Sequence, residues 1–190
     1  MLLSVLIPTL PERSLLLAEL YQSLARQRDR LIQKDHVEII VLMDQGQRSI
    51  GRKRNELKHI ASGEYIVFVD DDDAVSEDYL EVILEGIRLH HPDVLTFHSL
   101  VTINGGDPKE CIYSSRFTKD DDKPDHYERL PNHLCPVRAV IAPDFADINF
   151  GEDALYAITL LPRLASDAHI AEVLYYYRYV SSTSRSTMKH

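Results

Sequence analysis

The chain has 190 residues, a length typical of one domain that can bury a substantial core. Hydrophobic residues make up 44% and charged residues 27%, a composition typical of folded globular proteins and not of disordered ones. The formal net charge of −9 argues against broad binding to nucleic acid phosphates, because that binding depends on clustered Lys and Arg.

Neither the cysteines nor the N-terminus indicates export from the cell. Cys111 and Cys135 are too few for a disulfide framework and lack a metal-type CxxC spacing, so we expect buried thiols. The apolar N-terminus has no basic region or cleavage site and is interrupted by Pro8 and Pro11. No apolar run approaches the roughly 20 residues that span a bilayer. We therefore expect a cytoplasmic protein without a transmembrane segment.

The first half of the chain alternates apolar runs with amphipathic segments. The apolar runs, which predict buried strands, are LSVLIPT (3–9), VEIIVLMD (37–44) and EYIVFV (64–69). Apolar residues recur at helical spacing over 14–33 and 49–62, and we expect the second helix to end at a left-handed Gly63. After the third run, Ser76 is expected to cap another helix. This alternation predicts an α/β fold with a mostly parallel, Rossmann-like sheet, helices on both faces, and ligands beyond the carboxyl ends of the strands.

The second half of the chain is less regular. It predicts strands over 93–103 and 110–117 around a Gly105-Gly106 turn, a helix over 151–161 and a strand over 169–180. The charged segment 119–132 has turn residues without apolar periodicity, so we expect a loop or lid. A second lid is expected over 178–190, where Arg178 and the Ser and Thr residues after it would close over a ligand.

Four consecutive carboxylates, Asp70 to Asp73, follow the third predicted strand directly. Adjacent carboxylates raise one another's pKa unless a cation joins them. Hard cations such as Mg²⁺ and Mn²⁺ prefer carboxylate oxygens and complete their shell with substrate phosphates. The pattern therefore favours a metal site, and the alternative is a solvated acidic turn in which Asp73 or Ser76 caps the next helix.

These segments resemble family 2 glycosyltransferases of the GT-A fold. SVLIPT, VEIIVLMDQG and GRKRNELKHIASGEYIVFVDDDD are similar, in this order, to the family's two nucleotide-binding strands, its Arg-Asn pair and its DxD motif. FGEDALYAITLLP resembles the segment that supplies the family's catalytic base. The resemblance covers about residues 3 to 85 and resumes at that segment. It implies one GT-A-like domain over 1–190, with a donor half at 1–103 and a small irregular acceptor half at 104–190.

The resemblance assigns one group of residues to the nucleotide-sugar donor. They are Pro8, Thr9, Arg13, Asp44, Arg54, Asp70 and Asp71. Asp44 would contact the base or ribose, and capping of its own turn is an equal alternative. Arg54 would contact the diphosphate, because guanidinium binds phosphate oxygens in a bidentate manner. The alternative for Arg54 is a solvated helix face shared with Arg52 and Lys53.

The resemblance also implies a metal site and a general base. Asp70 and Asp72 would hold Mn²⁺ or Mg²⁺, with Asp72 favoured for direct ligation. Asp153 would deprotonate the acceptor hydroxyl while the metal offsets charge on the departing diphosphate. The alternative is that Glu152 and Asp153 only favour the positive end of a helix. The family inverts the anomeric centre in one displacement, without a covalent sugar intermediate.

The expected function is transfer of one sugar, from a UDP-sugar by preference, to an acceptor hydroxyl. The acceptor is left open among saccharides, lipid carriers, proteins and modified nucleobases, and so is the oligomeric state. One rival is a haloacid dehalogenase-like phosphatase, because Asp71, Asp73 and Val75 follow its DxDx(T/V) order. A nucleotidyltransferase would need a glycine-rich loop after the first strand, which is missing. The non-enzymatic rival is a metal-dependent nucleotide- or sugar-binding module, or an inactive transferase relative.

Three histidines, His98, His133 and His169, show no metal-ligand spacing, so we expect them in the core or at its rim. The tyrosines of 175–177 are expected to serve packing in a strand.

Overall fold

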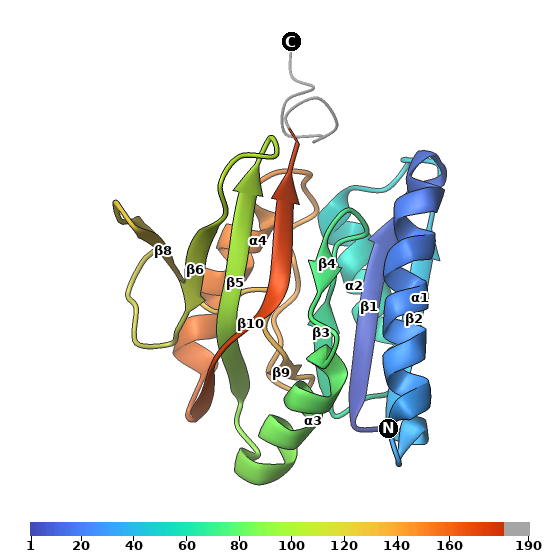
Figure 1. Cartoon of the computed structure of the whole chain (residues 1–190), viewed down its shortest axis with the longest axis horizontal. Helices are drawn as coiled ribbons and strands as arrows, with labels where there is room; N and C mark the ends of the chain where they lie inside the picture. Colours follow the sequence, from blue (N-terminus) through green and yellow to red (C-terminus); the bar gives the residue numbers. More distant parts are fainter. Residues whose placement is uncertain (181–190) are drawn as a thin grey trace.

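A computed structural model describes residues 1–180 of the chain. These residues form one ten-stranded mixed sheet with helices on both faces (Figure 1). The strands are β1 (Leu3–Thr9), β2 (Val37–Met43), β3 (Tyr65–Phe68), β4 (Ala74–Val75), β5 (Val94–Ile103), β6 (Lys109–Tyr113), β7 (Asp121–Asp122), β8 (His126–Arg129), β9 (Val137–Arg138) and β10 (Asp167–Tyr179). The α-helices are α1 (Ser14–Arg30), α2 (Ile50–Ile60), α3 (Tyr79–His90) and α4 (Glu152–Leu160), with short 3-10 turns at Pro11–Arg13, Lys34–His36 and Leu161–Arg163.

The sheet has the order β2-β1-β3-β9-β5-β6-β8-β7, and β10 pairs with both β4 and β5. Strands β2, β1 and β3 are parallel, so the carboxyl ends of β1 and β3 reach the same edge of the sheet. The pair β5 and β10 is also parallel. The expectation of a mostly parallel sheet is confirmed for these pairs and for β6 with β8, whereas β4, β7 and β9 form only antiparallel pairs and β6 follows β5 through a hairpin.

Helices cover both faces of the sheet, as expected. Helix α1 lies beside α3, and α2 lies beside α4 on the other face (Figure 1). The core between these layers includes the fully or almost fully buried side chains of Leu6, Phe68 and Phe97. Cys111 and Cys135 are buried free thiols, which confirms that expectation. No helix within residues 1–180 is long and apolar enough to cross a membrane.

Gly63 does not end α2 in a left-handed conformation, so that prediction was wrong. The helix ends at Ile60, and Ala61 is already extended, with φ −66° and ψ 139°. A Cβ at Gly63 would lie 2.5 Å from the Ser4 hydroxyl oxygen and 2.6 Å from the Ser4 backbone nitrogen. The glycine is therefore needed for the close approach of the chain to β1.

Ser76 does not cap α3, which begins at Tyr79 without a side-chain cap from its own N-cap residue. Gln27 of α1 supplies the contact instead. Its Nε2 donates to the Ser76 carbonyl oxygen at 2.8 Å, and its Oε1 accepts from the Leu80 backbone N–H at 3.0 Å. The cap thus comes from a helix about fifty residues earlier, and the alternative of a capping Ser76 or Asp73 is wrong.

Segment 119–132 is not a structureless loop. Strands β7 and β8 pair antiparallel within it, and β8 pairs parallel with β6. The apolar periodicity of a strand is absent because charged side chains pair along this edge. Lys123 lies 2.8 Å from Asp121, and Arg129 lies 2.7 Å from Asp122. Most of the second expected lid, residues 181–190, lies outside the described residues.

We expect Gly63→Ala to lower the free energy of unfolding by about 2–4 kcal/mol, because the new methyl group must displace backbone of β1. Chemical denaturation monitored by circular dichroism measures this. Gly105→Ala is the matched control, since Gly105 has φ +73° but nothing lies within 4 Å of a Cβ there. Gly105→Ala should lower the free energy of unfolding by only about 1 kcal/mol, through backbone strain. Equal losses in the two variants would contradict the close-approach role of Gly63.

Candidate active site

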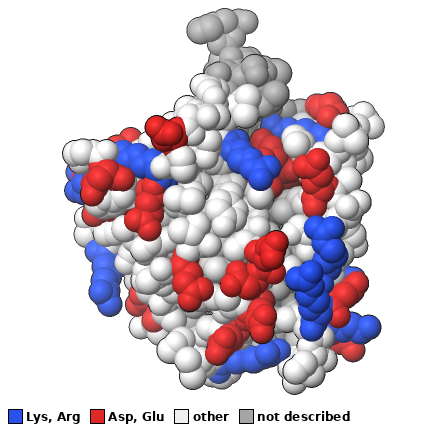
Figure 2. Space-filling view, in the orientation of Figure 1, with Lys and Arg blue, Asp and Glu red and all other residues white. Residues whose placement is uncertain are grey.

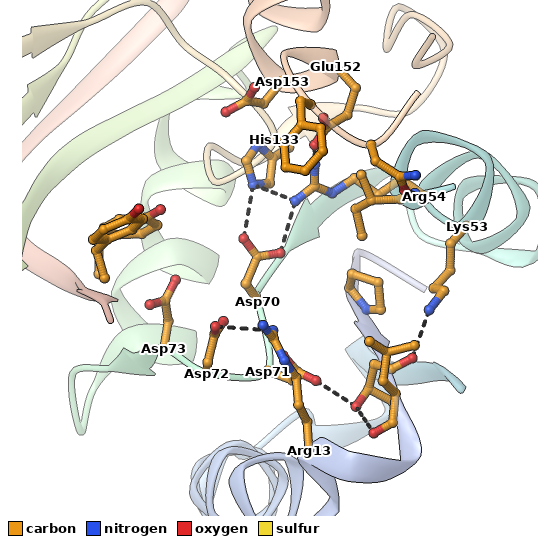
Figure 3. A pocket seen from close by; sticks show the side chains of 18 of the residues that line it. Arg13, Lys53, Arg54, Asp70, Asp71, Asp72, Asp73, His133, Glu152 and Asp153 are labelled. Atoms are coloured by element: carbon orange, nitrogen blue, oxygen red, sulfur yellow. Dashed lines mark hydrogen bonds and ion pairs between the residues drawn. The ribbon is translucent and has the colours of Figure 1, made fainter. Parts of the chain in front are cut away.

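A cavity of about 330 Å³ lies at the edge of the sheet where β1 and β3 end (Figure 3). Its size is in the range of small-molecule sites. The charged and imidazole side chains that line it are Arg13, Arg48, Lys53, Arg54, Asp70, Asp71, Asp72, Asp73, His133, Glu152, Asp153 and Arg178. Of the residues predicted for the donor, Pro8 and Thr9 also line the cavity, and Asp44 does not.

Arg54 is an almost fully buried charge of the site. Its Nη2 donates to Asp70 at 2.9 Å, and its Nη1 donates to Glu152 at 2.6 Å. The guanidinium lies over the ring of Phe145, 5.5 Å from the ring centre. Arg54 is only 3% exposed, so the alternative of a solvated helix face is wrong for this residue.

Asp70 lies at the centre of the cavity wall in Figure 3. It accepts a hydrogen bond from Arg54 and lies 3.5 Å from Nε2 of His133. Burial alone would raise the pKa of Asp70, but Arg54 and His133 hold it well below its usual range. Asp70 is therefore ionised at neutral pH.

Asp71 and Asp73 fix the acidic turn to two other parts of the fold. Asp71 accepts hydrogen bonds from Oγ1 of Thr9 at 2.6 Å and from Nη1 of Arg13 at 2.8 Å. Asp73 accepts from the Tyr175 hydroxyl and from the Arg178 backbone N–H, both at 2.7 Å. Both carboxylates are almost fully buried. These contacts join the turn to β10 and to residues 9–13, the end of β1 and the 3-10 turn after it, which we call the β1 loop.

Asp72 is the most accessible of the four carboxylates. Its side chain is 29% exposed, and its one ion pair within the described residues is with Arg13 at 3.1 Å. Burial raises the pKa of Asp72 to about 6, with Asp70 and Asp71 adding to the shift and Arg13 opposing it. The carboxylate oxygens of Asp72 thus face the cavity, and a cation bound there would lower the energetic cost of their negative charge.

The side chains present fit a hard divalent cation that is bound partly by the protein and partly by oxygens of a diphosphate. Within residues 1–180 no group of three His, Cys, Asp or Glu side chains could hold a metal by itself. Mg²⁺ is commonly bound by only one or two carboxylates, with substrate phosphates supplying further oxygens. Asp72, with Asp70 beside it, can provide that share, and the raised pKa of Asp72 indicates charge that is not fully compensated.

Asp44 and Lys53 form a buried pair behind the cavity. Lys53 Nζ lies 2.5 Å from Asp44 and donates to the Thr9 carbonyl oxygen at 2.8 Å. Asp44 also accepts hydrogen bonds from the backbone N–H groups of Gly46 and Arg48, so it does cap its own turn. The buried position of Lys53 again rules out the solvated helix face. Contact of Asp44 with a base or ribose stays a prediction.

Asp153 and Glu152 begin α4 after Gly151, which has φ 78°. Both line the cavity from the side opposite Asp71 and Asp72 (Figure 3). Glu152 is buried against Arg54, whereas Asp153 is half-buried and forms no ion pair within the described residues. Of the two acids, only Asp153 therefore has a carboxylate open to the cavity.

Sequence reasoning missed His133, Lys53 and Glu152 as site residues. His133 contacts Arg54 through Nε2 at 3.0 Å, although the segment around it shows no motif or periodicity. The prediction that His133 lies in the core or at its rim is confirmed by its burial, but it did not include this contact. For Lys53, a neighbour of Arg54 on α2, and for Glu152, the only signal was adjacency to a predicted site residue.

The sequence comparison finds one family model that matches the middle of the chain. Residues 43–135 match the model described as Glycosyl transferase family 2. The chain is similar to glycosyl transferase family 2 over this stretch, which is just under half of its length. That match spans the Arg-Asn pair, the acidic turn and His133, and it stops before α4. A comparison with curated proteins found no match.

Solved structures show that residues of this chain adopt a GT-A-like fold. The chain matches TarS residues 1–349 from S. aureus with a TM-score of 0.73 and 20% identity, covering 94% of this chain and 60% of that one. The same fragment in complex with UDP gives a TM-score of 0.72 with the same identity and coverage. The complex with UDP-GlcNAc gives 0.71 at 19% identity, covering 94% and 58%. The chain thus spans about 60% of the length of the TarS fragment.

We expect Arg54→Gln to lower the free energy of unfolding by about 3–5 kcal/mol, because the buried carboxylate of Glu152 and the half-buried carboxylate of Asp70 lose their common cation. Thermal or urea unfolding measures this. Arg52→Gln is the matched control, since the Arg52 side chain is 62% exposed and its one ion pair among residues 1–180 is with Glu56 at the surface. Arg52→Gln should lower the free energy of unfolding by less than about 1 kcal/mol. Similar losses for the two variants would contradict the buried ion pair.

We expect Asp72→Asn to stabilise the metal-free protein at pH 8 by about 1–3 kcal/mol. The pKa of Asp72 is about 6 in the folded state, above its unfolded value of about 3.9, so ionisation of this carboxyl opposes folding above pH 6. The gain should shrink as the pH falls from 6 and vanish below about 4, where the carboxyl is protonated in both states. Urea unfolding with EDTA at pH 4, 6 and 8 measures the difference.

The matched control for that series is Asp29→Asn, an exposed aspartate of α1, which should show no measurable change. Destabilisation by Asp72→Asn at pH 8 would show that Asp72 ionises without cost in the metal-free protein.

Proposed function

We propose that this protein is a family 2 glycosyltransferase that moves one sugar from a UDP-sugar to an acceptor hydroxyl with inversion, using Mn²⁺ or Mg²⁺. One observation carries the proposal: Asp72 and Asp153 face one cavity of about 330 Å³ from two sides (Figure 3). A single displacement needs this separation, because the leaving diphosphate departs from one face of the anomeric carbon while the acceptor attacks the other. Charge compensation and proton removal then occur at opposite ends of one site.

The donor would lie against the β1 loop and the acidic turn. Pro8, Thr9 and Arg13 border this part of the cavity, and Arg13 is held in place by Asp71. A metal held by Asp72, with Asp70 beside it, would neutralise charge on the diphosphate. The choice of UDP is supported by the TarS structures, which contain UDP and UDP-GlcNAc.

Arg54 would lie behind the diphosphate and keep Asp70 ionised at neutral pH. Its Nη2 contacts both Asp70 and His133, whereas its Nη1 donates to Glu152 and carries a second hydrogen. The guanidinium can therefore donate to a phosphate oxygen while it retains both carboxylates. Direct contact with the donor remains part of this proposal.

Asp153 would act as the general base. Glu152 is poorly placed as a base, because its carboxylate is buried and Nη1 of Arg54 already donates to it at 2.6 Å. Asp153 sits at the second position of α4, where its carboxylate accepts only from the Ala154 backbone N–H among the side-chain bonds of the described residues. It can therefore accept a proton from a hydroxyl in the cavity.

The chemical class of the acceptor stays open, and the surface charge of the protein narrows the choice. On the face shown in Figure 2, Lys and Arg side chains are scattered among acidic ones, and the middle of the face is uncharged. No single basic patch covers that face. With the net charge of −9, this favours an acceptor other than duplex nucleic acid.

The phosphatase alternative has a specific weakness. It needs Asp71 as a nucleophile, yet Asp71 is 2% exposed and held by Thr9 and Arg13. The binding-module alternative predicts nucleotide binding without turnover, so the experiment must measure both properties.

The test is UDP release from a panel of UDP-sugars, beginning with UDP-GlcNAc, with Mn²⁺ and candidate acceptors, together with calorimetric binding of UDP. Asp153→Asn should reduce kcat about 10²–10⁴-fold, because general-base catalysis contributes that factor, and should leave UDP affinity within twofold. Asp72→Asn should weaken Mn²⁺-dependent UDP binding at least tenfold. Asp107→Asn, an exposed aspartate after the β5–β6 turn, should change neither.

Transfer at the normal rate by Asp153→Asn would reject the assignment of the base. UDP binding by the wild-type protein without transfer or donor hydrolysis for any sugar would favour the binding module.

A further inference from the structure

Two histidines meet on the sheet outside the cavity. His98 lies on β5 and His169 on β10, and His169 is opposite Thr96 in the parallel register. His98 is two residues beyond Thr96, so the two imidazoles are diagonal neighbours on the same face. Their Nε2 atoms are 3.1 Å apart. His169 is exposed and the His98 side chain is 16% exposed, so solvent reaches the pair.

The hydrogen-bond partners allow one arrangement of protons that suits both rings. Nδ1 of His98 lies 2.8 Å from Oε1 of Glu110, and an ionised carboxylate can only accept, so this nitrogen carries a hydrogen. Nδ1 of His169 lies 2.9 Å from Oγ1 of Thr96, and that hydroxyl also lies 3.3 Å from the Ala168 carbonyl oxygen. When the hydroxyl donates to the carbonyl, Nδ1 of His169 donates to the hydroxyl. In the neutral rings, both Nε2 atoms are then left with lone pairs and no hydrogen.

Two lone pairs that face each other across 3.1 Å repel unless a cation lies between them. A metal ion binds imidazole nitrogen at about 2.0–2.1 Å, and at ligand angles of 90–110° this places two nitrogens about 2.9–3.4 Å apart. The observed separation lies within that range. The pair therefore has the spacing of two ligands of one ion.

We propose that His98 and His169 form a binding site for one divalent transition metal ion, with Zn²⁺ and Cu²⁺ as its natural occupants. Water would complete the coordination, since no third His, Cys, Asp or Glu ligand is gathered there within the described residues. Glu110 and Thr96 supply the supporting contacts, because metal-binding histidines characteristically donate their other N–H to a carboxylate or similar acceptor.

This site differs in chemistry from the acidic turn. Imidazole nitrogens favour Zn²⁺ and Cu²⁺, whereas carboxylate oxygens favour Mg²⁺ and Mn²⁺. A bound ion would join β5 to β10 just before the register shift between Ile170 and Val173. The site should therefore stabilise the pairing of these strands.

The test is calorimetric titration of untagged, EDTA-stripped protein with Zn²⁺ at pH 7.5, with excess Mg²⁺ present to occupy the acidic turn. We expect one Zn²⁺ per wild-type chain and a rise in thermal midpoint on binding. His98→Gln and His169→Gln should each abolish this binding, and Glu110→Gln should weaken it about tenfold by removing a supporting contact. His126→Gln is the matched control, because His126 also contacts a carboxylate through Nδ1 but has no imidazole partner within the described residues.

A second measurement keeps the test valid if a variant fails to fold. Electron paramagnetic resonance of the wild-type protein with one equivalent of Cu²⁺ should show hyperfine coupling to two nitrogens. Absence of Zn²⁺ binding, binding unchanged in both histidine variants, or a copper spectrum with only oxygen ligands would each overturn the proposal. None of these readouts uses a sugar donor, so they are independent of the proposed transferase activity.

Discussion

The position of the buried Arg54 guanidinium between Asp70 and Glu152 is the interaction on which the cavity depends. The arginine comes from α2, Asp70 follows β3, and Glu152 begins α4, so one cation links three elements from both halves of the chain. Burying these charges is costly unless all of them are paired, which strongly disfavours arrangements that separate the elements. Because Asp153 directly follows Glu152, the same contact also fixes where the proposed base lies relative to the acidic turn.

The four aspartates of that turn have different tasks despite their identical side chains. Asp70 is bound to α2, Asp71 to the β1 loop, and Asp73 to β10, each through donors from another part of the fold. These three contacts determine the shape of the turn and leave the carboxylate of Asp72 facing the cavity. Burial and the neighbouring carboxylates raise the pKa values of both Asp72 and Asp73, and of these two Asp72 has the more exposed carboxylate, which a cation in the cavity can reach.

Much of the fold could be predicted because apolar runs and helical spacing are local properties of the chain. The errors occurred where a distant residue decides the outcome, as when Gln27 replaces Ser76 as the cap of α3. The acidic turn and Asp153 were visible as charges next to predicted elements. His133 was not, because its role depends on meeting Asp70 across a separation of 63 residues, and no pattern within its own segment encodes that contact.

The position of β10 has a consequence for how the protein assembles during synthesis. The donors that hold Asp73 come from Tyr175 and Arg178, which follow it by 102 and 105 residues. The ribosome therefore releases the acidic turn long before its partners exist, and the turn can reach its final shape only when β10 inserts between β4 and β5. Closing so long a loop makes this a late step in folding. A newly made chain should thus acquire its three-layer core before it acquires a working pocket.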